Sequence, residues 1–184
     1  MTSHNRVAFL AADGVEQIEH DVPWRALTAA SFRPELVSMS SGQITAFTFP
    51  EPTGTYQVHR TFDHVSADEY VAVVIPGGTA SPDLLRNDAE AVAFVRSASA
   101  LNLPIAAICH APWLLIEAGL APGRRFTSWP SLATDIRNAG GDWEDQPVVI
   151  DHNIITSRGP EDLEAFCRAI TTALLDRRWR RAQG

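Results

Sequence analysis

Short apolar runs alternate with stretches of helical periodicity along this chain. The run Val7–Ala12 ends at Asp13-Gly14 and is followed by apolar side chains at helical spacing from Ile18 to Ala30, so a strand followed by a helix is predicted. Further predicted strands are Arg33–Ser40, Val71–Ile75, Pro104–Ile108 and Arg125–Ser128, a hairpin-like pair is Ile44–Phe49 with Tyr56–Arg60, and a hairpin is Val148–Ile150 with Ile154–Ser157. Further predicted helices are Asp88–Leu101, Ala111–Gly119, Ser131–Ala139 and Pro160–Trp179.

This alternation of buried strands and helices predicts an α/β fold with a mostly parallel sheet and helices on both faces. The length of 184 residues, of which 45% are hydrophobic, fits a single domain spanning residues 1–184. In such sheets a site forms in the crevice at the carboxyl ends of the strands. The segments expected there are Asp13–Glu19, Pro76–Asp83 and Cys109-His110.

Charge and composition exclude several classes of function. The formal net charge is -7, and all 15 basic residues are arginine, so enzymes that need a lysine amine are excluded, including pyridoxal phosphate enzymes and Walker-A nucleotide binders. The acidic balance argues against a nucleic-acid partner, and the arginine-rich end Arg177–Arg181 is interpreted as a solvated terminus. With no apolar run of membrane-spanning length and a polar start, we expect a cytoplasmic protein without a membrane partner.

Cys109 is the strongest candidate for a reactive group. It directly follows the apolar run Pro104–Ile108 and directly precedes a predicted helix, and such sharp turns display nucleophiles. The unpaired N–H groups and the positive end of the helix dipole favour a thiolate. The alternative is an unreactive cysteine in the core, which is the interpretation preferred for Cys167 in the last helix.

Glu16 is the carboxylate expected opposite Cys109, because it lies just past the end of the first strand. If buried, it would have a raised pKa and could move a proton during turnover. Glu19 and His20 follow at offsets of three and four and could mimic a metal site, but a solvated first helical turn is the simpler interpretation, and no metal is predicted.

Other candidates surround these two residues. The side chain of His110 is expected to point away from Cys109, whereas its backbone N–H could form an oxyanion hole with that of Gly78. Asp83, taken alone, is interpreted as a turn or helix cap, and His152 as part of a hairpin turn.

The motifs together resemble the ThiJ/PfpI superfamily, in particular its PfpI-like branch, over residues 6 to 175. The matching stretches are Ala12–Glu19, Val74–Gly78, Ser81–Arg86, Ala107–Leu115, Ala118–Leu120, Thr127–Pro130, Asn138–Gly140 and Ile155–Pro160. The resemblance implies a flavodoxin-like sandwich that assembles as homodimers or homohexamers and needs no cofactor.

The resemblance also suggests roles for individual residues. It implies that Cys109 is the family's nucleophilic cysteine and Glu16 the glutamate of the family motif. It also implies that His110 is the histidine that follows the nucleophile in the strand-to-helix turn, and that Asp83 reaches a histidine of a neighbouring subunit. Gly77 and Arg158 are expected near the pocket. Two departures stand out: Asp83 occupies a place where glutamate is common, and Ala111 replaces a common glycine.

Three functions remain open at this stage. The first is a stress-response enzyme of the glyoxalase III or deglycase type, in which Cys109 attacks a small reactive dicarbonyl and Glu16 shuttles a proton. The second is an intracellular cysteine peptidase using Cys109 and His110, with Asp83 from a neighbouring subunit. The third is an oxidative-stress sensor in which Cys109 is oxidised without turnover.

Overall fold

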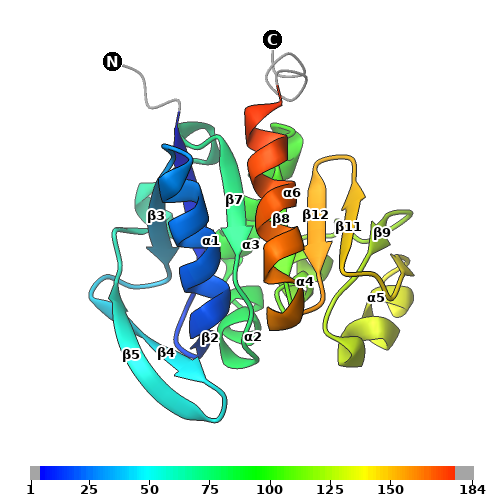
Figure 1. The fold of residues 1–184 in the computed structure, drawn as a ribbon, viewed down its shortest axis with the longest axis horizontal. Helices are drawn as coiled ribbons and strands as arrows, with labels where there is room; N and C mark the ends of the chain where they lie inside the picture. Colours follow the sequence, from blue (N-terminus) through cyan, green and yellow to red (C-terminus); the bar gives the residue numbers. More distant parts are fainter. Residues whose placement is uncertain (1–4, 177–184) are drawn as a thin grey trace.

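A central seven-stranded sheet organises the fold in the computed structural model, which describes residues 5–176 (Figure 1). The strands lie in the order β11-β12-β8-β7-β1-β3-β6, and all neighbours pair in parallel except β11 with β12. Their bounds are Arg6–Leu10 (β1), Arg33–Ser38 (β3), Arg60–Thr61 (β6), Ala72–Ile75 (β7), Ile105–Ile108 (β8), Val148–Asp151 (β11) and Ile154–Ser157 (β12). The predicted mostly parallel α/β sheet is confirmed.

Helices cover both faces of this sheet. Figure 1 shows α1 (Gln17–Ala29) and α6 (Leu163–Leu175) on one face and α3 (Ala89–Ala100) and α4 (Pro112–Glu117) on the other. Successive strand residues feed two separate cores: Phe9 packs with Phe166 of α6, whereas Ala8 and Leu10 pack with the cluster that contains Leu114 of α4. This alternation follows from the period of two along a strand buried on both sides.

The smaller elements differ most from the sequence prediction. β4 (Gln43–Thr48) pairs with β5 (Glu51–Gln57), which was expected only from Tyr56, and β2 (Val15–Glu16) joins β4 on its other side. All but one residue of β5 is exposed, so its sequence carries no alternation of apolar and polar positions, and pairing with β4 defines it. The other short elements are β9 (Arg125–Phe126), β10 (Asp142–Trp143) and α5 (Ala133–Asn138).

Two predicted boundaries are corrected. The segment Ser81-Pro82-Asp83, interpreted as a turn or helix cap, lies inside a helix, α2 (Ala80–Arg86), because Pro82 falls in the first turn, where a helix needs no N–H from it. The last helix begins with a 3-10 turn at Pro160–Asp162, and its predicted end at Trp179 lies outside the described residues, as does the arginine-rich segment 177–181.

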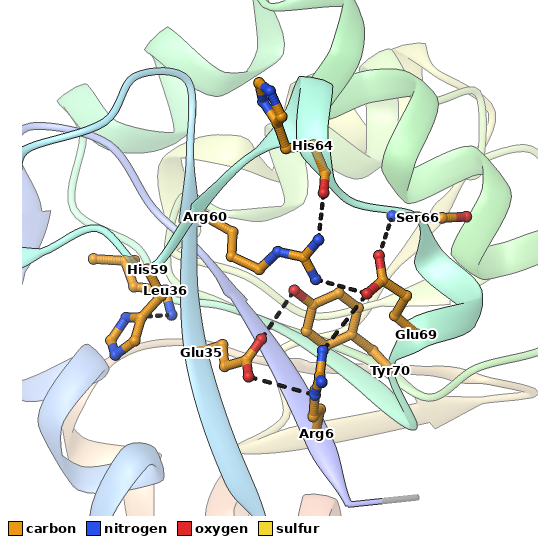
Figure 2. Close-up of polar contacts among 9 residues, drawn as sticks. All are labelled: Arg6, Glu35, Leu36, His59, Arg60, His64, Ser66, Glu69 and Tyr70. Atoms are coloured by element: carbon orange, nitrogen blue, oxygen red, sulfur yellow. Dashed lines mark hydrogen bonds and ion pairs between the residues drawn. The ribbon is translucent and has the colours of Figure 1, made fainter. Parts of the chain in front are cut away.

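A polar network fastens the edge strand β6 to the sheet (Figure 2). The Arg60 guanidinium donates to Glu69 Oε2 at 2.6 Å and to the His64 carbonyl oxygen. Arg6 lies 3.5 Å from carboxylate oxygens of both Glu35 and Glu69. Opposite charges therefore alternate across β1, β3 and β6 at the end of the sheet.

No helix in the described part of the chain combines the length and the apolar character needed to cross a membrane.

Candidate active site

The three segments predicted at the carboxyl ends of the strands do come together. They border a cavity of about 570 Å³ between the ends of β1, β7 and β8 and the hairpin β4–β5. The lining residues are Gly14, Glu16, Glu19, Phe47, Thr48, Phe49, Pro50, Gly78, Thr79, Ala80, Cys109, His110, Trp129 and Pro160. The parallel sheet explains this convergence, because it brings the carboxyl ends of its strands to one edge.

Cys109 occupies a strained turn between β8 and α4. Its φ is +62°, in the left-handed region that residues with a side chain rarely adopt. The Cys109 N–H donates to the Ser157 carbonyl at 3.1 Å, and its carbonyl accepts the Trp129 N–H at 3.0 Å. These two hydrogen bonds hold the backbone of the turn, and Cys109 lines the floor of the cavity.

Hydrogen-bond donors surround the sulfur of Cys109. The backbone N–H groups of Gly78 and His110, the pair expected to form an oxyanion hole, both point at this sulfur. The His110 side chain does not point away as expected, because its Nδ1 lies 3.2 Å from Cys109 Sγ. Burial lowers the pKa of His110, so its imidazole is neutral at neutral pH.

The carboxyl group beside Cys109 belongs to Glu19, and the expected placement of Glu16 there is wrong. Glu19 is fully buried, its Oε2 accepts the Gly77 N–H at 2.9 Å, and its carboxyl group interacts with the Cys109 thiol. Glu16 directly precedes α1 without a side-chain capping hydrogen bond and lines the cavity, where its Oε2 accepts the Phe49 N–H at 3.4 Å.

Glu19 rather than Glu16 lies beside Cys109 because of the face of α1 that meets the sheet. Pro23 and Leu27 are buried on that face, and Glu19 precedes Pro23 by one helical spacing of four residues. The side chain of Glu19 therefore continues the buried stripe toward the end of β1. Glu16 precedes the first residue of the helix and has an extended backbone, so its side chain does not continue the helical stripe. The spacing 19, 23, 27 was the signal in the sequence that could have identified Glu19.

Burial controls the protonation of this pair. It raises the pKa of Glu19 to about 8, with the nearby Glu16 carboxyl adding to the rise and the Gly77 N–H opposing it. Burial also raises the pKa of the Cys109 thiol, a Glu19 carboxylate adds to this rise, and the N–H groups of Gly78 and His110 oppose it. The site thus disfavours two adjacent negative charges, and because both pKa values are raised, the thiol and the carboxyl group each hold a proton at neutral pH.

Two glycines make this close approach possible. A Cβ atom on Gly77 would lie 2.5 Å from Glu19 Oε2 and 2.6 Å from Cys109 Cβ. Gly78 has a φ of +82°, and a Cβ there would lie 2.3 Å from the Gly14 carbonyl oxygen. Any side chain at either position would push apart the groups that surround the sulfur.

Other predicted site residues lie outside the cavity. Asp83 is exposed on α2 and does not line the cavity of this single chain. Arg158 is also absent from the lining, because its guanidinium forms ion pairs at 2.8 Å with both Asp162 and Asp145. Cys167 is half-buried in α6, away from the cavity lining.

The two histidines that the sequence analysis did not assign to the site, His20 and His152, lie in the packed interior and in a turn. His20 is buried, with its ring stacked on Tyr56 at a centroid distance of 3.9 Å and its Nδ1 3.1 Å from Asp21 Oδ1. His152 adopts a φ of +51° in the turn between β11 and β12. Within residues 5–176, no three His, Cys, Asp or Glu side chains are grouped as metal ligands would be.

Comparison with known proteins adds an independent line of evidence. Residues 5–173 match the model of the DJ-1/PfpI family. A deglycase of Thermococcus kodakarensis is 37% identical over 169 residues, which cover 92% of this chain and 99% of the relative. The protein/nucleic acid deglycase 2 of Escherichia coli is 35% identical over 89% of this chain and 94% of its own length. A Bacillus subtilis relative named as a cysteine protease is 36% identical over 89% of this chain and 94% of its own length.

A solved structure agrees with these sequence relatives. A two-domain protein of Anabaena variabilis, with a DJ-1/ThiJ/PfpI-like and a ferritin-like domain, superimposes with a TM-score of 0.84 and 36% identity. The match covers 94% of this chain and 48% of the Anabaena chain.

Proposed function

Because this chain belongs to the DJ-1/PfpI family, we propose that it is a cysteine enzyme acting on small reactive dicarbonyls or their adducts, of the glyoxalase III or deglycase type. One observation carries the proposal. The Cys109 thiol and the Glu19 carboxyl group share a buried cavity floor, and the N–H groups of Gly78 and His110 point at the sulfur. The names of the relatives from Thermococcus and Escherichia support the same class of reaction.

The first step forms a covalent adduct. The Cys109 thiol first loses its proton to water while Glu19 keeps its own; the thiolate then attacks the aldehyde carbon of methylglyoxal, a C–S bond forms, and the carbonyl electron pair moves to oxygen. The N–H groups of Gly78 and His110 stabilise the developing oxyanion, and Glu19 delivers its proton to this oxygen. The product of this step is a hemithioacetal beside a Glu19 carboxylate.

The remaining steps isomerise and release the adduct. The Glu19 carboxylate removes the proton from the carbon bonded to sulfur and returns it to the neighbouring carbon, while the hydroxyl proton of the first carbon moves to the oxygen of the second, so the hemithioacetal becomes the thioester of lactate. Water then cleaves the thioester, releasing lactate and regenerating the Cys109 thiol. The net change is the addition of one water molecule, and no external oxidant or reductant is needed.

The test is lactate formation from methylglyoxal by purified protein in an amine-free buffer with a metal chelator. We expect many molecules of lactate per molecule of protein, because Cys109 is regenerated in every cycle. The heat-denatured protein serves as the control for uncatalysed reaction. If Cys109 instead reacts once with peroxide and no lactate exceeds the control, the enzyme proposal fails and the sensor function takes its place.

A cysteine peptidase is the second candidate, and one distance favours it. His110 Nδ1 lies 3.2 Å from Cys109 Sγ, within reach of a base that takes the thiol proton. In this alternative Asp83, exposed on α2, would orient a histidine of a neighbouring subunit in a homodimer or homohexamer. Hydrolysis of a fluorogenic peptide that disappears in Asp83→Asn, with Glu19→Gln still active, would favour the peptidase over the dicarbonyl enzyme.

A further inference from the structure

Two acidic side chains line the cavity. Among the described residues that line it, only Glu16 and Glu19 carry a carboxyl group, and no arginine joins them. Glu19 is held protonated by burial, with its pKa raised to about 8, and His110 is neutral because burial lowers its pKa. Glu16 is therefore the negative charge that an incoming molecule meets.

Glu16 lines the cavity and contacts the backbone of the β4–β5 turn. Its carboxylate accepts the N–H of Phe49, which ties the start of α1 to the turn between β4 and β5. Its charge also reaches the reacting pair, since it contributes to the raised pKa of Glu19. A second negative charge brought into the cavity would be repelled at short range, where water screens poorly.

The mouth of the cavity is apolar. Phe49 is 81% exposed at the tip of the β4–β5 turn, and Trp129 is 43% exposed. Phe47, Pro50, Ala80 and Pro160 add to the apolar part of the lining. Exposed aromatic side chains that border a concave site mark it as a place for an apolar group of a ligand.

The size of the cavity points in the same direction. A volume of about 570 Å³ falls in the range of sites that enclose organic ligands of many atoms. A three-carbon dicarbonyl bound to Cys109 would fill only the floor and leave the apolar mouth in contact with water. A larger apolar substituent on the aldehyde would cover Phe49 and Trp129 and gain their burial.

We propose that this cavity selects uncharged dicarbonyls with a large apolar or aromatic substituent, and that Glu16 rejects those with a carboxylate or phosphate group. The inference rests on the proposed function for the reacting dicarbonyl group. The charge selection itself is a property of the cavity and can be measured without turnover.

The rate of Cys109 alkylation provides that measurement. Iodoacetamide and iodoacetate both form a C–S bond with the thiolate and release iodide, and they differ chiefly in the negative charge of the second reagent. We expect Glu16→Gln to reduce the ratio of the iodoacetamide rate to the iodoacetate rate about tenfold, because it removes the like-charge repulsion. The glutamine keeps an oxygen that can accept the Phe49 N–H, so the turn retains its anchor.

Matched variants make the result specific. Glu51→Gln removes one negative charge from exposed β5, outside the cavity lining, and should leave the ratio unchanged. Phe49→Ala should slow the reaction of iodoacetanilide more than that of iodoacetamide, because the phenyl group loses its contact at the mouth. A ratio that is the same in the wild type and in Glu16→Gln would overturn the charge selection, whatever the outcome of the lactate assay.

Turnover of dicarbonyls that differ in size and charge tests whether the same selection applies to substrates. The wild type should convert phenylglyoxal to mandelate with a higher kcat/KM than methylglyoxal to lactate, and should convert 4-carboxyphenylglyoxal poorly. Equal kcat/KM values for phenylglyoxal and its carboxylate would overturn the substrate class. Turnover of neither compound nor of methylglyoxal, with the alkylation result intact, would instead reject the proposed function alone.

Discussion

Replacing Cys109 by serine should lower kcat for lactate formation from methylglyoxal by roughly 10³-fold or more, as expected for loss of a nucleophile. The serine hydroxyl fits the turn at the end of β8, but its proton is far more tightly held than that of the thiol. The donors arranged around the sulfur, from Gly78 and His110, favour a thiolate and provide no base strong enough to activate an alcohol. The measurement is the initial rate of lactate release at saturating methylglyoxal.

Cys167→Ser is the matched control for this variant. Cys167 is half-buried in α6 and does not line the cavity, so its replacement should leave the rate of lactate release as it is in the wild type. If Cys109→Ser retains most of the wild-type rate while Cys167→Ser loses it, the assignment of the nucleophile is wrong.

Replacing Glu19 by glutamine should have the second largest effect, a decrease in kcat of about 10²- to 10⁴-fold. The amide has nearly the same shape as the protonated carboxyl group and can still accept the Gly77 N–H, but it cannot give up and take back a proton. Glu16→Gln is the comparison, because it removes a carboxyl group from the wall of the same cavity. It should cost less than Glu19→Gln, since Glu16 makes no contact with the sulfur comparable to that of Glu19.

The pH dependence of both variants distinguishes proton transfer from packing. In the wild type, kcat should fall as pH rises through about 8, because Glu19 then loses the proton that it donates to the oxyanion. Glu19→Gln should lack this decrease, and Glu16→Gln should retain it, with its midpoint shifted to lower pH because one like charge is gone. If kcat of Glu19→Gln also decreases as pH rises through about 8, the group that titrates is not Glu19.

The free energy of unfolding should depend on pH through the same proton on Glu19. The native protein holds a proton on Glu19 up to about pH 8, whereas an ordinary glutamate in the unfolded chain loses it near 4.5. The native state therefore binds more protons across this window, and the unfolding free energy should fall by the order of a few kcal/mol as pH rises through it. Glu19→Gln should remove this part of the pH dependence, as measured by denaturant unfolding at a series of pH values.

The sequence predicted the sheet well where burial leaves a clear pattern. The strands β1, β7 and β8 are apolar on both faces, and their runs identified them within two residues at either end. Strand β5 is different, because it is exposed and contains proline and glycine, and its pairing with β4 defines it. A single-sequence pattern records burial, and an exposed strand leaves almost no such record.

The candidate site was predicted in outline and wrongly in one central residue. The position of Cys109 between strand and helix follows from local sequence alone. The choice between Glu16 and Glu19 depends on which face of α1 meets the sheet, a tertiary property that only the stripe with Pro23 and Leu27 indicates. The approach of the His110 ring to the sulfur depends on the left-handed backbone of Cys109, which no local pattern specifies.

Glu19 in its protonated form is central to this account, and infrared difference spectroscopy observes that form directly. The carbonyl stretch of a protonated carboxyl group is well separated from the bands of a carboxylate, so the wild type and Glu19→Gln can be compared as pH is raised. The account predicts a protonated-carboxyl band at neutral pH that disappears as pH passes about 8 and is absent from Glu19→Gln. A wild-type spectrum without that band at neutral pH would show an ionised Glu19 and contradict the protonated carboxyl group on which the proposed reaction depends.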